Sequence, residues 1–206
     1  MSDQPLTVLI LGHSFVRRAT DYIQLNPTLS NLGLSKDTHD IHFISRPGCH
    51  ARNLRNSFSQ ILEIQPDLIL LDIGTNDLTV MSPQQLFSQV YAVAQDIIDM
   101  CQVKRVVLLQ VLPRTVEGRW GQPPPFQEKV ESYNSLLKSQ VYQDKMSSVS
   151  PQPTIGFWFH KGFRTDISSL ISDGVHLNDA GLPLYIRSLR RAVLKASPEV
   201  RRALLN

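Results

Sequence analysis

The sequence predicts an α/β fold in which a parallel sheet is covered by helices on both faces. Five short apolar runs of strand length alternate with longer segments whose apolar residues recur at helical spacing. The chain has 206 residues, of which 42% are hydrophobic and 19% charged, as in ordinary globular domains. We find no repeat and no linker that would divide it, so we expect a single domain spanning residues 1–206. Collagen-like, coiled-coil and disordered classes are excluded.

The strands are expected where the apolar runs are short and rich in branched residues. They are Thr7–Gly12, His42–Ser45, Leu68–Ile73, Arg105–Val111 and Ile155–Phe159. None of these runs approaches the roughly 18 apolar residues that a membrane-spanning helix needs. The first residues, Met-Ser-Asp-Gln-Pro, lack the basic segment that begins a signal peptide, so no such peptide is expected.

Five apolar stripes at helical spacing predict the helices. In order they cover Phe15–Ile23, Leu54–Leu62, Leu86–Ile98, Phe126–Val141 and Leu182–Val193. Pro66 should end the second helix. The sequence Ser82-Pro83-Gln84-Gln85 predicts the start of the third, because it offers a capping serine, a proline at the first helical position and a glutamine at the third. The last helix is expected to end near Lys195 and to leave Ala196–Asn206 free.

Two cysteines, Cys49 and Cys101, are too few for a disulfide framework and suit a reducing compartment. We therefore expect an intracellular, cytoplasmic protein. No cysteine and histidine cluster has the spacing of a zinc site, and no metal or cofactor is expected.

In an open parallel sheet, ligands bind beyond the carboxyl ends of the strands. Ser14 follows the first strand at a strand-to-helix turn, where its hydroxyl can act as a nucleophile. His176 is a candidate base, and Asp173, three residues earlier, can orient it. The donors available to stabilise an oxyanion are the backbone N–H groups of Ser14 and Gly48 and the side-chain amide of Asn76.

Each of these residues also has a purely structural interpretation. A serine after a strand commonly caps a helix, and a glycine can serve a turn that needs a positive φ angle. Asn76 and Asp77 read equally well as turn residues. A histidine near a helix start is commonly a surface or core residue.

Taken together and in order, four segments resemble the sequence blocks of the SGNH (GDSL-type) hydrolase superfamily. They are Leu9–Ser14, Gly48, Gly74-Thr75-Asn76-Asp77 and the stretch from Asp173 to Asn178. The resemblance covers nearly the whole chain. The chain is also similar to the esterase modules of LINE-type retrotransposons and to platelet-activating-factor acetylhydrolase catalytic subunits. The resemblance implies a flavodoxin-like three-layer fold, Ser14 as nucleophile, His176 as base supported by Asp173, and an oxyanion hole of Ser14, Gly48 and Asn76.

The first block departs from the family pattern, since it reads Gly-His-Ser where Gly-Asp-Ser is usual. The replaced aspartate is not the catalytic acid of the family, so the triad stays formally complete. His13 is either a tolerated structural variant or a second titrating group beside Ser14. We include it in the expected substrate pocket with Trp120 and Phe126, which lie on the long non-periodic loop after the fourth strand and could wall an acyl site.

The net charge of +3 hides an asymmetry. The segment from Arg187 to the end holds six of the 21 basic residues and one of the 18 acidic ones, so it carries +5 and the preceding 186 residues carry −2. This basic face is either merely solvated or makes weak electrostatic contact with an anionic membrane or RNA.

The sequence therefore predicts a serine esterase that hydrolyses a carboxylic ester, acetyl or lipid, through an acyl-serine intermediate without a cofactor. The alternatives are a lipid- or carbohydrate-binding module without catalysis on the same fold, and an esterase module of a retrotransposon nucleoprotein. The oligomeric state is not predicted.

Overall fold

The computed structural model describes residues 4–116, 118–119, 121–122, 125–147, 155–163 and 167–205 of the chain. Five parallel strands form one sheet in the order β2-β1-β3-β4-β5. They are β1 (Leu6–Gly12), β2 (His39–Ser45), β3 (Leu68–Asp72), β4 (Arg105–Leu109) and β5 (Ile155–Trp158). The predicted α/β class and all five strands are confirmed, and only the strand ends differ.

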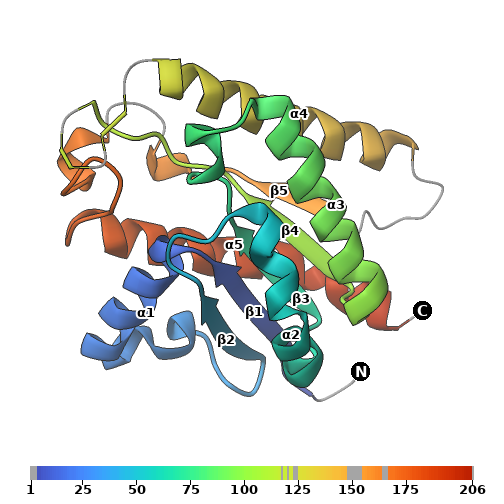
Figure 1. The fold of residues 1–206 in the computed structure, drawn as a ribbon. Coiled ribbons are helices and arrows are strands. Elements are labelled where there is room, and N and C mark those ends of the chain that lie inside the picture. The colour runs from blue at the N-terminus through green and yellow to red at the C-terminus, as the bar shows by residue number, and fades with distance from the viewer. Residues whose placement is uncertain are drawn as a thin grey trace.

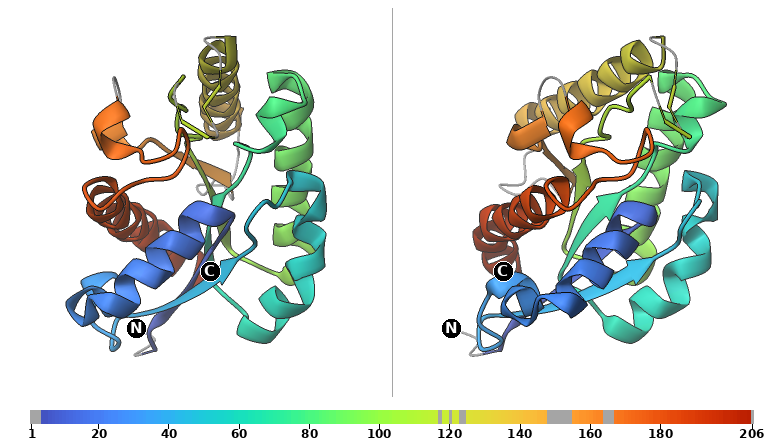
Figure 2. Two further views of the ribbon diagram at one scale, coloured as in Figure 1. Left: turned by 60° about the vertical axis from the view of Figure 1, so that its left-hand side comes forward. Right: turned by 90° about the vertical axis from the view of Figure 1, so that its left-hand side faces the viewer.

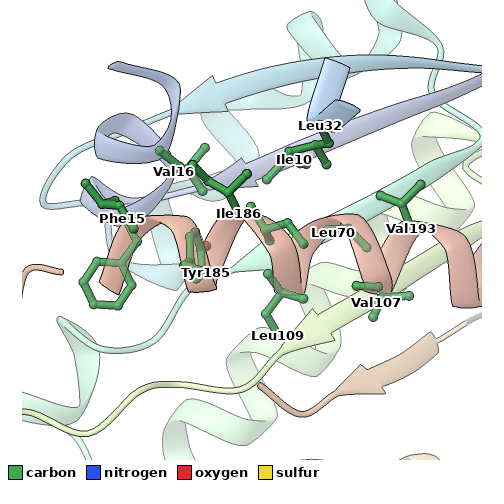
Figure 3. Close-up of a cluster of buried hydrophobic side chains, with 14 of the residues drawn as sticks. Ile10, Phe15, Val16, Leu32, Leu70, Val107, Leu109, Tyr185, Ile186 and Val193 are labelled. Carbon is green, nitrogen blue, oxygen red and sulfur yellow. The ribbon is translucent and has the colours of Figure 1, made fainter. Parts of the chain in front are cut away.

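Helices cover both faces of the sheet, so the fold has three layers (Figures 1 and 2). One layer holds α1 (Ser14–Leu25) and α5 (Gly181–Leu204), and the other holds α2 (Phe58–Ile64), α3 (Pro83–Cys101) and α4 (Pro125–Ser147). Side chains of a strand alternate between faces, so Ile10 packs beneath α1 and α5 (Figure 3) while Leu11 packs in the opposite layer. Burial on both faces explains why these strands read as continuous apolar runs.

The start of α3 is capped as the sequence predicts. The Ser82 hydroxyl accepts the Gln85 N–H at 3.2 Å, and the Gln85 side chain accepts the Ser82 N–H at 3.0 Å. The second predicted helix differs, because its first part is a 3-10 helix, Ala51–Ser57, and only then does α2 begin. It ends before Pro66 as expected, with Gln65 in the left-handed region.

The last helix is longer than predicted. α5 continues past Pro198 to Leu204, and Ala196 and Val200 are 5% and 1% exposed against the core beneath α1. The expectation that Ala196–Asn206 is free is therefore wrong over the described part of that segment. Burial of this apolar stripe outweighs the backbone hydrogen bond that Pro198 cannot donate.

Cys49 and Cys101 are both buried and unbridged. Within the described ranges, no helix combines the length and the apolarity that a bilayer span requires.

The sheet register brings three strand ends together. Gly12 at the end of β1 pairs with Ser45 at the end of β2 on one side and with Asp72 at the end of β3 on the other. Ser14, Gly48 and Asn76 each follow one of these ends within a few residues, at the carboxyl edge of the sheet.

Candidate active site

Ser14, His176 and Asp173 form a chain of hydrogen bonds at the carboxyl edge of the sheet. The Ser14 Oγ lies 3.0 Å from His176 Nε2, and His176 Nδ1 lies 2.8 Å from Asp173 Oδ2. A carboxylate only accepts hydrogen bonds, so Nδ1 carries the ring proton and Nε2 faces the hydroxyl as an acceptor. This is the tautomer that a general base needs.

The loop that carries the histidine and the aspartate is held as a tight turn. An antiparallel bridge between Ile171 and Leu177 closes its base, and Gly174 adopts a φ of +96° at its tip. The loop after β4 supports it from outside, because the Thr115 N–H donates to the Gly174 carbonyl at 3.0 Å. A Cβ added to Gly118 would approach the Asp173 carbonyl carbon to 2.5 Å, so the two loops pack closely.

The Asp173 carboxylate is stabilised in its charged form. Partial burial alone would raise its pKa, but hydrogen bonds from the His176 ring and from the backbone N–H groups of His176 and Val175 lower the pKa below its ordinary value. The Arg18 guanidinium on α1 lies 3.7 Å from the same carboxylate. Asp173 can therefore orient the imidazole and stabilise it when it becomes charged.

Ser14 is the first residue of α1 and follows β1 after a two-residue step. The free N–H groups and the dipole of the helix start favour negative charge here. Within the described residues, neither the Ser14 N–H nor the Gly48 N–H donates to an acceptor. Gly48 has a φ of +73°, and a Cβ added there would point into open space. Both N–H groups are thus available to an oxyanion.

The amide of Asn76 has a defined orientation. Arg114 has no acceptor atom, and its Nη2 lies 3.3 Å from Asn76 Oδ1, so the oxygen of the amide faces the guanidinium. The Nδ2 group donates to the Cys49 carbonyl at 3.2 Å and retains a second N–H. Arg114 is itself fixed by the Thr75 carbonyl at 2.9 Å and lies over the Phe126 ring at 5.1 Å.

Asp77 connects this segment to the loop that carries Gly48. Its side chain is fully buried and accepts the Ala51 N–H at 3.1 Å, and His50 Nδ1 lies 3.2 Å from it. Asp77 therefore supports the loop that carries Gly48.

The three residues expected to line a substrate pocket lie in different environments. His13 is 1% exposed, and its ring faces Asp72. Phe126 is 4% exposed and packs in the core with Tyr133 while supporting Arg114. In this structure neither side chain offers a substrate an open surface. Trp120 lies outside the described residues.

Two features of the site were missed in the sequence. Arg114 follows β4 at the carboxyl edge and could have been found as a basic residue beside a buried strand end. Asp72, which is 3% exposed and contacts both His13 and Tyr185, is the single charged residue of the third apolar run.

The fold and the site together define an α/β protein with a serine, a histidine and a carboxylate in hydrogen-bond contact at the carboxyl edge of its sheet. The sequence matches the GDSL-like lipase/acylhydrolase family over residues 11–182. The chain therefore belongs to this family and is a carboxylic ester hydrolase. No curated protein sequence matches it.

Solved structures share the fold at low sequence identity. An acetyl xylan esterase has 18% identity over 91% of this chain and 100% of its own, with a TM-score of 0.68. A GDSL-like lipase from Bacteroides thetaiotaomicron has 18% identity over 92% and 88%, with a TM-score of 0.64. A catalytic mutant of an acetylxylan esterase from Geobacillus stearothermophilus has 16% identity over 93% and 95%, with a TM-score of 0.60. These likenesses support the three-layer, flavodoxin-like architecture.

Proposed function

We propose that this protein is a serine esterase that cleaves short acyl esters through an acyl-Ser14 intermediate. The observation that carries the proposal is the continuous hydrogen-bond chain from the Ser14 hydroxyl through the His176 ring to the Asp173 carboxylate. In such a chain the imidazole takes the serine proton while the carboxylate stabilises the imidazolium that results.

In the first half of the reaction, the Ser14 Oγ attacks the carbonyl carbon of the ester and its proton moves to His176 Nε2. The carbonyl oxygen becomes an oxyanion, which the N–H groups of Ser14 and Gly48 and the Asn76 amide would receive. When the carbon–oxygen bond to the alcohol breaks, Nε2 returns the proton to the leaving alkoxide. The acyl group remains on Oγ.

In the second half, a water molecule gives its proton to His176 Nε2 and attacks the acyl carbon. The second oxyanion collapses, the bond to Oγ breaks, and the serine recovers its proton from Nε2. The products are a carboxylic acid and the free enzyme. Asp173 stays ionised throughout, in keeping with its lowered pKa.

Acetyl and other short acyl groups are the substrate class that we favour. Two of the similar structures are described as acetylxylan esterases. The interior side of the site is closed, because Phe126 and Arg114 are both buried there. We therefore expect p-nitrophenyl acetate to be hydrolysed faster than the octanoyl and palmitoyl esters.

The test is to measure hydrolysis of these three esters by the wild type and by Ser14→Ala. The variant should lose turnover of all of them, since it lacks the attacking oxygen, while its melting temperature stays close to that of the wild type. Equal turnover by the pure variant would remove Ser14 from the mechanism. A wild type that hydrolyses none of the esters would instead favour a binding module on the same fold.

A further inference from the structure

A second histidine–aspartate contact lies behind Ser14, inside the protein. His13 Nε2 is 3.3 Å from Asp72 Oδ1, and the Tyr185 hydroxyl donates to the other oxygen of Asp72. All three side chains are almost fully buried, and Tyr185 rises from α5 beside Phe15 (Figure 3). Burying a carboxylate costs free energy unless it is hydrogen-bonded. Asp72 therefore needs hydrogen-bond donors at positions 13 and 185.

The Asp72 carboxyl is ionised at neutral pH. Burial alone would raise its pKa, but the adjacent His13 ring and the hydrogen bonds from that ring and from the Tyr185 hydroxyl lower the pKa below its ordinary value. His13 Nε2 therefore carries a proton that it donates to Asp72.

The other nitrogen of the His13 ring contacts the backbone next to the nucleophile. His13 is the N-cap of α1, and its Nδ1 accepts the Phe15 N–H at 3.4 Å. A nitrogen that accepts a hydrogen bond carries no proton, so this contact places the ring proton on Nε2, toward Asp72. The ring is thus attached at Nε2 to the end of β3 and at Nδ1 to the first turn of α1.

The backbone on both sides of His13 has little freedom to move. A Cβ added to Gly12 would approach the Asp72 carbonyl oxygen to 2.5 Å and Val16 to 2.7 Å, so β1 passes close to β3 and α1 at this point. On the other side, the peptide between His13 and Ser14 carries the N–H that can serve the oxyanion. The contacts of the His13 ring therefore restrain the backbone on which this N–H and the Ser14 side chain lie.

We propose, resting on the proposed function, that His13 and Asp72 form a buried positioning pair that orients the His13–Ser14 peptide for catalysis. His13 contacts no reacting atom and is a positioning residue. The departure from Gly-Asp-Ser in the first block is thus a functional part of this chain. Asp72 at the end of β3 supplies the carboxylate that makes a histidine suitable at position 13.

The pair can be tested with four variants on p-nitrophenyl acetate. His13→Asn keeps a side-chain oxygen that can cap the Phe15 N–H but cannot reach Asp72, and Asp72→Ala removes the carboxylate. Because a displacement of about 1 Å can cost about 100-fold in rate, we expect kcat to fall about 10- to 100-fold in each, with KM changed less than about threefold. The double variant should fall no further than the worse single variant, since the two residues act as a unit.

The conservative variant Asp72→Asn should rescue most of the rate. Its Oδ1 can still accept from His13 Nε2, and its amide can donate to the Tyr185 oxygen, so the ring stays in place without the charge. We expect kcat within about tenfold of wild type. Activity equal to wild type in His13→Asn would mean that only the helix cap matters, and would overturn the proposal.

A matched control separates positioning from plain stability. Ser197→Ala removes a contact of 3.0 Å between Ser197 Oγ and the buried ring of His39. His39 begins β2, so this contact lies at the amino ends of the strands, away from Ser14. This variant should lower the melting temperature and leave kcat unchanged. If His13→Asn and Asp72→Ala behave in the same way as this control, the pair is only structural.

Hydrogen exchange gives a readout that does not depend on activity. The Arg17 amide, which donates to the His13 carbonyl at 3.3 Å, should exchange at least about tenfold faster in His13→Asn and in Asp72→Ala than in Ser197→Ala, because the helix start is then less constrained. Unchanged exchange would overturn the positioning pair whether or not the wild type is an esterase. If the wild type shows no turnover but the variants show the expected exchange rates, the result would count against the proposed function alone.

Discussion

Ser14 lies between two histidine–aspartate pairs that differ in burial and in what they contact. In the outer pair, His176 and Asp173 are 2.8 Å apart and their side chains are 18% and 27% exposed. In the inner pair, His13 and Asp72 are 3.3 Å apart and 1% and 4% exposed. The outer histidine contacts the Ser14 hydroxyl, whereas the inner one contacts the backbone N–H of the next residue.

This difference indicates which pair can exchange protons during a reaction. His176 is partly exposed and contacts the Ser14 hydroxyl, and its second nitrogen is fixed by a charged partner, so it is suited to become an imidazolium and pass the proton on. His13 has both nitrogens engaged inside the protein and has no solvent contact. Two pairs of the same chemical type therefore suit different tasks, proton transfer outside and backbone positioning inside.

The largest expected loss of kcat comes from variants that break the outer pair. Removing the base in His176→Ala should lower kcat on p-nitrophenyl acetate by on the order of 10⁶-fold, because the serine proton then has no acceptor. Asp173→Asn should cost about 10⁴-fold by favouring the wrong tautomer. Stopped-flow or long-time assays of kcat, beside His13→Asn, check the ranking. An inner-pair variant that costs more than His176→Ala, at equal folded fraction, would reverse the assignment of the two pairs.

A second effect concerns the oxyanion donors that both pairs serve. Asn76→Ala should lower kcat about 100- to 1,000-fold with little change in KM, since the amide acts on charge that develops in the transition state. Asp77→Ala is the matched neighbour, because Asp77 supports the Gly48 loop through Ala51. Asp77→Ala should mainly lower the melting temperature. Equal catalytic losses without a change in stability would contradict this division.

Buried and exposed histidines should also differ in how they affect the free energy of unfolding at acid pH. Burial lowers the pKa of His160 to about 4 from 6.5, against an opposing contribution from Asp72. Between these values the unfolded chain binds a proton that the folded chain does not, so the free energy of unfolding falls as the pH falls, by up to about 3 kcal/mol.

Urea unfolding at about pH 7 and about pH 4.5 measures this loss. In His160→Gln the loss should be smaller than in the wild type. His42→Gln is the control, because His42 is 39% exposed. The same pH dependence in wild type and His160→Gln would rule out His160 as its source.

Sequence reasoning worked best where the cause is local. The strands and the capping of α3 depend on neighbouring residues, and so does the spacing of Asp173 and His176 within one turn. The inner pair forms because the ends of β1 and β3 are aligned and Tyr185 on α5 packs beside them. Arg114, after β4, contacts Asn76, after β3. No short sequence window contains such contacts. The extension of α5 beyond Pro198 was missed because tertiary burial outweighs the usual effect of a proline.

The smallest expected effect concerns the outer face of α5, far from either pair. Arg187, Arg191 and Lys195 recur at helical spacing and are exposed, and among the described residues they form no ion pair. We propose weak, salt-sensitive binding of this face to anionic vesicles or RNA, at about 1 kcal/mol per basic side chain at low salt. Co-sedimentation of Arg187→Gln/Arg191→Gln should weaken about tenfold or more, and that of Lys138→Gln/Lys145→Gln on α4 should not. Equal binding by both double variants would make the face merely solvated.

The most direct test of the account is covalent labelling of Ser14 by a fluorophosphonate, followed by intact mass and peptide mapping. The chain from Ser14 to His176 and Asp173 predicts one probe per protein molecule, attached at Ser14, in the wild type. Labelling should be absent in Ser14→Ala and strongly slowed in His176→Ala. A folded wild type that takes up no probe, or that takes it up equally in Ser14→Ala, would contradict a nucleophilic Ser14.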